Sequence, residues 1–99
     1  MEAKAQPNLW YEAASTDYNM FREEIEKERA RLESDPRTLT PDQRRSLDYL
    51  DDWLVRARRD LDRYDLPVDH TWTKVRHEAQ TTWDNLKREV RKALHEIRS

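Results

Sequence analysis

The chain has 99 residues and a formal net charge of -2, and 40% of its residues are charged. A chain of this length has room for one domain with one small core. It contains no glycine and no cysteine, which excludes glycine-rich nucleotide-binding loops, disulfides, thiolate metal sites and a cysteine nucleophile. Its richness in alanine, glutamate, lysine, leucine and arginine is typical of long helices.

The first predicted helix covers about residues 8–34, after an N-terminus of residues 1–7 that we expect to be flexible. Asn8 is a residue type that caps helix N-termini, and Pro36 is expected to end the helix just before it. Apolar residues recur at helical spacing on one face, and they are Tyr11, Ala14, Tyr18, Phe21, Ile25 and Leu32. Charged residues interrupt this stripe in its second half, so that half is expected to depend on neighbouring helices for stability.

The second predicted helix, about residues 41–65, has the clearest start signal. Thr40 is suited to the N-cap, Pro41 to the first helical position and Gln43 to the closing position of a capping box. Pro67 is expected to end the helix. Steps of three and four residues define a heptad seam like that of a coiled coil, made of Leu47, Leu50, Leu54, Ala57, Leu61 and Tyr64.

The third predicted helix covers about residues 70–98. Its apolar face is made of Trp72, Val75, Ala79, Trp83, Leu86, Val90, Ala93 and Ile97. Short connections force neighbouring helices to run antiparallel. The sequence therefore predicts an all-α fold, an antiparallel up-down-up three-helix bundle that forms a single domain over residues 1–99. Because the first helix has so thin a stripe, a homodimer that pools its helices into a larger bundle remains an alternative.

The charged residues give little indication of chemistry. Asp48 and Asp52 lie on the solvent side of the second helix together with arginines, where no dry cleft exists to shift a carboxylate pKa toward neutrality. His77 and His95 lie about 27 Å apart along the third helix, so one chain cannot bring both to one metal ion. We therefore predict no catalytic residue, no metal site and no cofactor, and we expect a chain that is not an enzyme.

Basic residues gather on the third helix, and they are Lys87, Arg88, Arg91 and Lys92. They support an alternative function, that of a small nucleic-acid-associated regulatory protein. The excess of positive charge there is too small for the surface that phosphate binding normally uses, so nucleic acid is the less favoured partner. Attachment of this helix to an anionic membrane is less favoured still, because its apolar residues are needed for the core.

The aromatic residues favour binding of protein. Tyr49 and Trp53 fall beside the heptad seam, on the flank of Arg56, where each is either core or an exposed anchor for a partner. Trp10 lies at the edge of the first helix, and Met20 is expected to be exposed. The favoured function is a protein-interaction or self-assembly module, with a partner helix docked across the first and second helices and contacting Trp10, Tyr49, Trp53 and Arg56.

The sequence also suggests a location. Nowhere do 18 apolar residues run together, and the first residues lack the apolar core of a secretory signal. The absence of cysteine fits a reducing compartment. We therefore expect a cytoplasmic protein without a small-molecule substrate.

Overall fold

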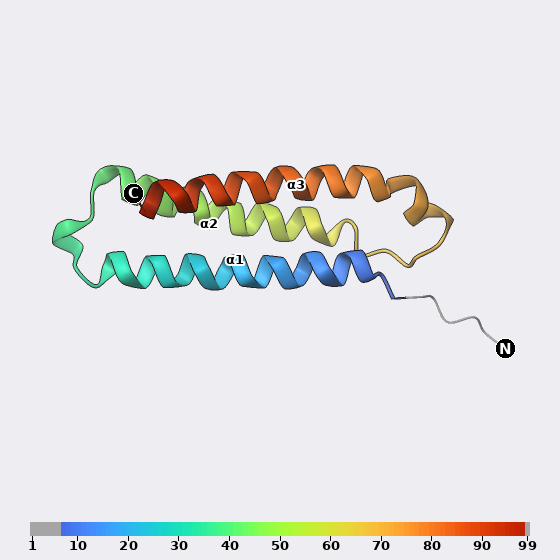
Figure 1. The fold of residues 1–99 in the computed structure, drawn as a ribbon, viewed down its shortest axis with the longest axis horizontal. Helices are drawn as coiled ribbons and strands as arrows, with labels where there is room; N and C mark the ends of the chain where they lie inside the picture. Colours follow the sequence, from blue (N-terminus) through green and yellow to red (C-terminus); the bar gives the residue numbers. More distant parts are fainter. Residues whose placement is uncertain (1–6, 99) are drawn as a thin grey trace.

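The computed structural model describes residues 7–98, apart from the side chain of Pro36, as a bundle of three long helices (Figure 1). α1 spans Leu9–Glu33, α2 spans Pro41–Asp62 and α3 spans His70–Arg98. A short 3-10 turn, η1 (Pro36–Thr38), lies between α1 and α2. Successive helices run antiparallel, so the predicted all-α three-helix bundle is confirmed for the described residues. Of the N-terminus that was expected to be flexible, residues 1–6 lie outside the described part of the chain.

The helix boundaries follow from local hydrogen bonds. At the start of α2, the Gln43 backbone N–H donates to Thr40 Oγ1 at 3.1 Å, and the Thr40 N–H donates to Gln43 Oε1 at 3.0 Å. This is the predicted capping box, which satisfies two donors that a helix start leaves unpaired. At the start of α3, Asp69 Oδ1 accepts from the backbone N–H of Thr71 at 2.8 Å.

Asn8 joins two distant parts of the chain. Its Oδ1 accepts from the backbone N–H of Tyr11 at 2.9 Å and so caps α1, as predicted. Its Nδ2 donates to the carbonyl oxygens of Tyr64 and Leu66, both at 3.0 Å. α2 ends at Asp62, before the predicted boundary at about residue 65, and two of the carbonyls beyond it are satisfied by this one amide.

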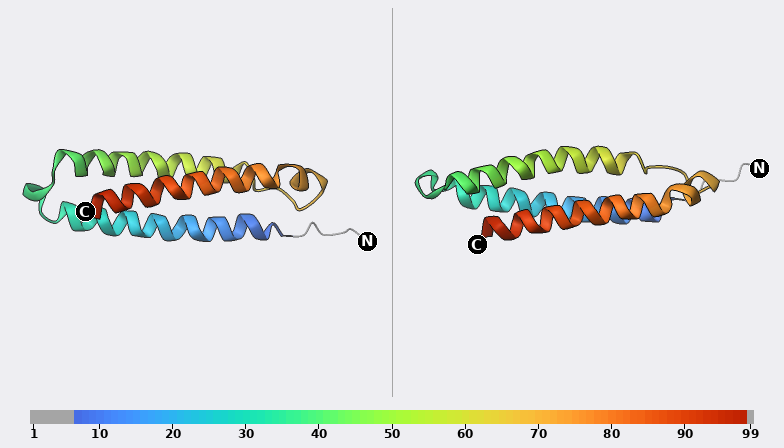
Figure 2. Two further views of the ribbon diagram at one scale, coloured as in Figure 1. Left: turned by 45° about the horizontal axis from the view of Figure 1, so that its top comes forward. Right: turned by 90° about the horizontal axis from the view of Figure 1, so that it is seen from above.

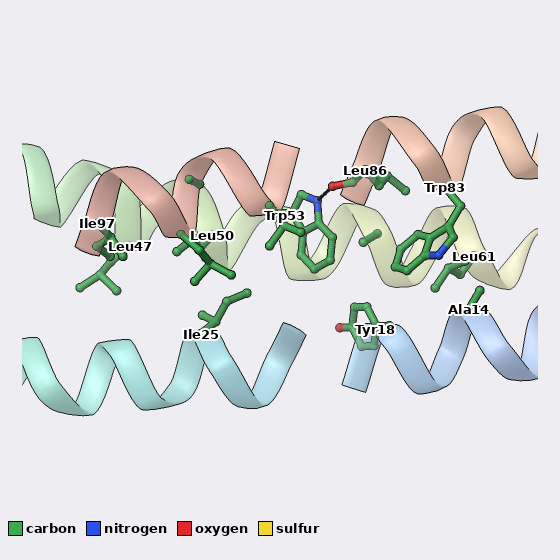
Figure 3. Close-up of a cluster of buried hydrophobic side chains, with 14 of the residues drawn as sticks. Ala14, Tyr18, Ile25, Leu47, Leu50, Trp53, Leu61, Trp83, Leu86 and Ile97 are labelled. Carbon is green, nitrogen blue, oxygen red and sulfur yellow. Dashed lines mark hydrogen bonds between the residues drawn. The ribbon is translucent and has the colours of Figure 1, made fainter. Parts of the chain in front are cut away.

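Each helix contacts the other two, and α2 and α3 share the most extensive interface. Figure 2 shows the three helices lying side by side in two further views. The predicted faces supply most of the core, which Figure 3 shows between the helices. One difference concerns α2, where Leu54 is only partly buried and Trp53 is fully buried. On α3, Leu94 is buried in addition to the predicted face. Both differences arise because each helix must cover two neighbours, which widens its buried stripe beyond a strict heptad seam.

Candidate interaction surface between α2 and α3

A cluster of polar contacts links Tyr49 and Arg56 on α2 to Glu89 on α3. Tyr49 is 39% exposed, and its hydroxyl donates to Glu89 Oε2 at 3.2 Å. Arg56 Nη2 donates to the same oxygen at 3.3 Å, and Arg56 Nε donates to Asp52 Oδ2 at 2.8 Å. The guanidinium carbon of Arg56 lies 5.7 Å from the centre of the Tyr49 ring. We call Tyr49, Arg56 and Glu89 the Tyr49 cluster; its contacts connect the exposed ring to both helices.

The Tyr49 cluster borders a groove of about 570 Å³ between α2 and α3, lined by Arg45, Ser46, Tyr49, Glu89, Lys92, Ala93 and Glu96. The Tyr49 ring and the Ala93 methyl group supply apolar surface, and arginine, lysine and glutamate side chains of both signs surround it. Tyrosine and arginine are the residue types of this lining that are enriched at protein interfaces.

The electrostatics of the Tyr49 cluster stabilise the protonated forms of Tyr49 and Arg56. Partial burial and the Glu89 carboxylate raise the pKa of Tyr49, despite the opposing effect of Arg56. Burial lowers the pKa of Arg56, but its hydrogen bonds with Asp52 and Tyr49 outweigh this effect, and the pKa is raised. At neutral pH the cluster therefore presents a protonated phenol and a charged guanidinium.

Trp53 belongs to the core, and its alternative role as an exposed partner anchor is wrong. Its side chain is 0% exposed, and its Nε1 donates to the carbonyl oxygen of Leu86 on α3 at 2.8 Å (Figure 3). The ring stacks on Tyr18 with the centroids 6.0 Å apart. The signal was present in the sequence, because Trp53 is three residues after Leu50 and four before Ala57, which places all three on one helix face.

Trp10 lies too far along the bundle to join the Tyr49 cluster. It is half-buried and packs against Tyr64 and Trp72, with ring centroids 6.0 and 5.4 Å away. Its Nε1 donates to Gln80 Oε1 at 2.8 Å. Trp10 thus covers the small core cluster beside the α2–α3 connection.

Of the four residues predicted to bind a partner, only Tyr49 and Arg56 lie close together. Both are on the side of α2 that faces α3, so the surface they form lies between α2 and α3, whereas the sequence had suggested one across α1 and α2. Glu89 was missed, because its contact with Tyr49 joins residues 40 positions apart and no spacing rule within one helix detects it.

The basic residues of α3 are partly engaged by other side chains of the bundle. Arg91 lies over the ring of Phe21 on α1, 5.8 Å from its centre, whereas Lys92 lines the groove beside α2. Lys87 pairs with Asp84 at 3.4 Å, and Arg88 donates to Asn85 at 3.4 Å. Lys87 and Arg91 lie one helical turn apart, as do Arg88 and Lys92, so the four residues form a stripe in which neighbouring side chains engage three of them.

Among residues 7–98, no three histidine, aspartate or glutamate side chains are grouped as a metal site requires. None of the helices in the described part of the chain has both the length and the apolar character needed to cross a membrane. No protein-family model matches the chain, and no curated protein or solved structure matches it either.

Proposed function

We propose that the chain is a non-enzymatic helical module that binds protein, and that the groove beside the Tyr49 cluster receives an amphipathic helix of the partner. The observation that carries the proposal is the Tyr49 ring, which is 39% exposed and is held between Arg56 and Glu89. Tyrosine and arginine are the residue types that most often dominate interface energies, together with tryptophan. A ring that is already ordered loses little conformational entropy on binding.

The groove suggests the chemistry of the partner. Its apolar part is small, and Arg45, Lys92 and Glu96 surround it. An amphipathic helix with one or two apolar anchors and flanking charges of both signs would match this rim. We place the interaction in the cytoplasm, in keeping with the lack of cysteine.

Contacts with arginine side chains keep two carboxylates in their charged form. Hydrogen bonds from Arg58 and Tyr11 lower the pKa of Asp62. Burial raises the pKa of Glu28, but hydrogen bonds from Arg31 and Arg98 outweigh it, and the pKa is lowered. Both groups are therefore ionised at neutral pH, and neither is the protonated carboxylic acid that general-acid catalysis needs.

The proposal is tested by capture of partners from extract of the native cell, with the purified chain as bait. Tyr49→Ala and Arg56→Ala are expected to reduce the captured partner roughly tenfold or more, as interface anchors do. Val55→Ala is the matched control, because Val55 is an exposed apolar residue of α2 outside this groove. Circular dichroism of each variant establishes that the helices are retained.

Each outcome of the capture experiment has a distinct meaning. Capture that falls with Tyr49→Ala and Arg56→Ala but not with Val55→Ala supports the proposal. Equal capture by all the variants contradicts the assigned groove, and the absence of any captured protein contradicts a partner other than the chain itself.

Nucleic-acid binding remains the alternative function. It has less support because contacts with Asp84, Asn85 and Phe21 engage three of the four basic residues, Lys87, Arg88, Arg91 and Lys92. Titration of random duplex DNA at low salt tests it. Binding that weakens steeply with added salt would favour it over protein association.

A further inference from the structure

A second groove, between α1 and α3, has opposite charges on its two sides. It measures about 470 Å³ and is lined by Asp17, Met20, Phe21 and Glu24 from α1 and by Arg91, Leu94, His95 and Arg98 from α3. Met20 is 58% exposed at its edge, as the sequence predicted, while Phe21 is half-buried and Leu94 is buried. The α1 side of the groove is thus acidic, the α3 side basic and the middle apolar.

Part of this charge is already used within the chain. Arg98 lies 3.9 Å from Glu24 and 3.2 Å from Glu28. Asp17 and Arg91, in contrast, form no ion pair within 4 Å with any described residue. Arg91 lies over the Phe21 ring but has no carboxylate partner within residues 7–98. One acidic and one basic group on opposite sides of the groove can therefore each form an ion pair with another molecule.

Symmetry makes this face complementary to itself. The interface of a two-fold dimer places the same patch of each copy against the other. A two-fold axis that runs along the bundle puts α1 of one copy opposite α3 of the other at the same height, so that acidic residues face basic ones. A two-fold axis across the bundle puts α1 against α1, so that acidic residues face acidic ones. Charge therefore selects the first arrangement.

We propose that the α1–α3 groove binds a second copy of this chain, related by a two-fold axis along the bundle, with Asp17 of each copy paired to Arg91 of the other. Met20 of each copy then covers the apolar middle of the opposite groove. This inference rests on the proposed function as an association module, and it adds a partner and a face distinct from the Tyr49 cluster.

The first test is the mass of the full chain in solution, measured by sedimentation equilibrium and light scattering over a wide range of concentration. The mass is expected to rise with concentration from that of one chain to that of two. A chain that stays monomeric at every concentration overturns the proposal. Loss of partner capture by Tyr49→Ala is measured separately, so a monomer that still captures a partner contradicts self-association alone.

Charge reversal tests the arrangement. Asp17→Lys and Arg91→Glu are each expected to weaken dimerisation roughly tenfold or more, because each places two like-charge contacts in the interface. The double variant Asp17→Lys/Arg91→Glu restores both pairs with the signs exchanged and is expected to recover dimerisation. Asp48→Lys is the matched control, since it makes the same charge change at an exposed position of α2.

The double variant distinguishes the two axes. If α1 faced α1, the exchange would leave like charges facing each other, and dimerisation would not recover; that result overturns the proposal. A dimer that is insensitive to both single variants also overturns it. Met20→Ala provides an uncharged check, because this exposed side chain makes little contribution to the monomer core and its loss is expected to weaken the dimer.

Discussion

The two halves of the bundle bury apolar surface in different ways. The half beside the α2–α3 connection, residues 8–21 and 53–83, contains every aromatic residue except Tyr49, and we call it the aromatic half. The other half, residues 22–52 and 84–98, is filled by aliphatic side chains such as Ile25, Leu50 and Ile97, and we call it the aliphatic half. Figure 3 shows both kinds of packing along the same core.

The aromatic half fixes how the helices are aligned. Its rings carry polar atoms that need specific partners when buried. Trp53 donates to a carbonyl of α3 at 2.8 Å, and the Tyr18 hydroxyl donates to the carbonyl oxygen of Leu54 on α2 at 3.0 Å. A shift of one helix along another would break these bonds and leave buried polar groups unpaired, which is costly.

The aliphatic half is stabilised by buried apolar side chains, which need no partner in a specific direction, and by ion pairs near its surface. Arg29 of α1 pairs with Asp51 of α2, and Arg98 of α3 pairs with Glu28 of α1. Side chains in such pairs are partly solvated, so each pair contributes about 0–1 kcal/mol. The alignment of the helices is therefore specified mainly by the aromatic half, while the aliphatic half adds stability.

The largest expected effect is that of Trp53→Ala, which should lower the free energy of unfolding by about 3–5 kcal/mol. It removes a fully buried ring and its hydrogen bond to α3. Leu50→Ala, one turn away in the aliphatic half, should cost about 2–4 kcal/mol. Urea titrations followed by circular dichroism measure both. A loss of less than about 1 kcal/mol for Trp53→Ala would contradict its place in the core.

Asn8→Asp tests the tie between α1 and the α2–α3 connection. At an ordinary N-cap, aspartate stabilises a helix about as well as asparagine. Here the change removes the two hydrogen bonds to Tyr64 and Leu66 and turns a carboxylate toward their carbonyl oxygens. The expected loss is about 1–3 kcal/mol in the free energy of unfolding. Asn8→Ser is the control that keeps a cap acceptor, and equal stability of Asn8→Asp and wild type would contradict the tie.

Acid should weaken the contact of Glu28 with Arg98. The folded-state pKa of Glu28 lies below its ordinary value of 4.5. Its contribution to stability is therefore fully present above pH 4.5 and is lost as the pH falls through the folded-state pKa. In Glu28→Gln, the free energy of unfolding should lack this loss at low pH, which is about 1 kcal/mol or less. Thermal unfolding at a series of pH values measures it.

Asp62 allows the same pH dependence of stability to be measured in the aromatic half. Its pKa is lowered in the same direction, by Arg58 and Tyr11, but its side chain is 53% exposed, compared with 13% for Glu28. Solvent therefore screens its pairing more strongly, and Asp62→Asn should change the acid dependence less than Glu28→Gln. A larger change for Asp62→Asn would reverse this ranking.

The smallest expected effect on stability is that of Tyr49→Phe, at the one aromatic residue of the aliphatic half. The hydroxyl is exposed and its bond to Glu89 is long at 3.2 Å, so its removal should change the free energy of unfolding by less than about 0.5 kcal/mol. The same variant should weaken partner capture, because the ring loses a contact that orients it. A loss of stability comparable to that of Leu50→Ala would show that Tyr49 belongs to the core.

The sequence predicted the helices and most of the buried faces, because spacing within one helix determines which side chains share a face. It did not predict Glu89 beside Tyr49, or the bonds from Asn8 to Tyr64, since these join residues far apart in the sequence. The uncertainty over Trp53 had a different origin. A strict heptad seam leaves out residues that face a second neighbour, and every helix of a three-helix bundle has two neighbours.

The unequal interfaces described for the fold also set the order in which the molecule comes apart. α2 and α3 share the most extensive interface, whereas α1 has the thinnest apolar stripe. α1 is therefore expected to detach as a unit while the α2–α3 hairpin persists as a partly folded state. Amide protons in the middle of α1 should then exchange with solvent faster than those in the middle of α3. The exchange rate in α1 would measure how often α1 detaches from the other two helices.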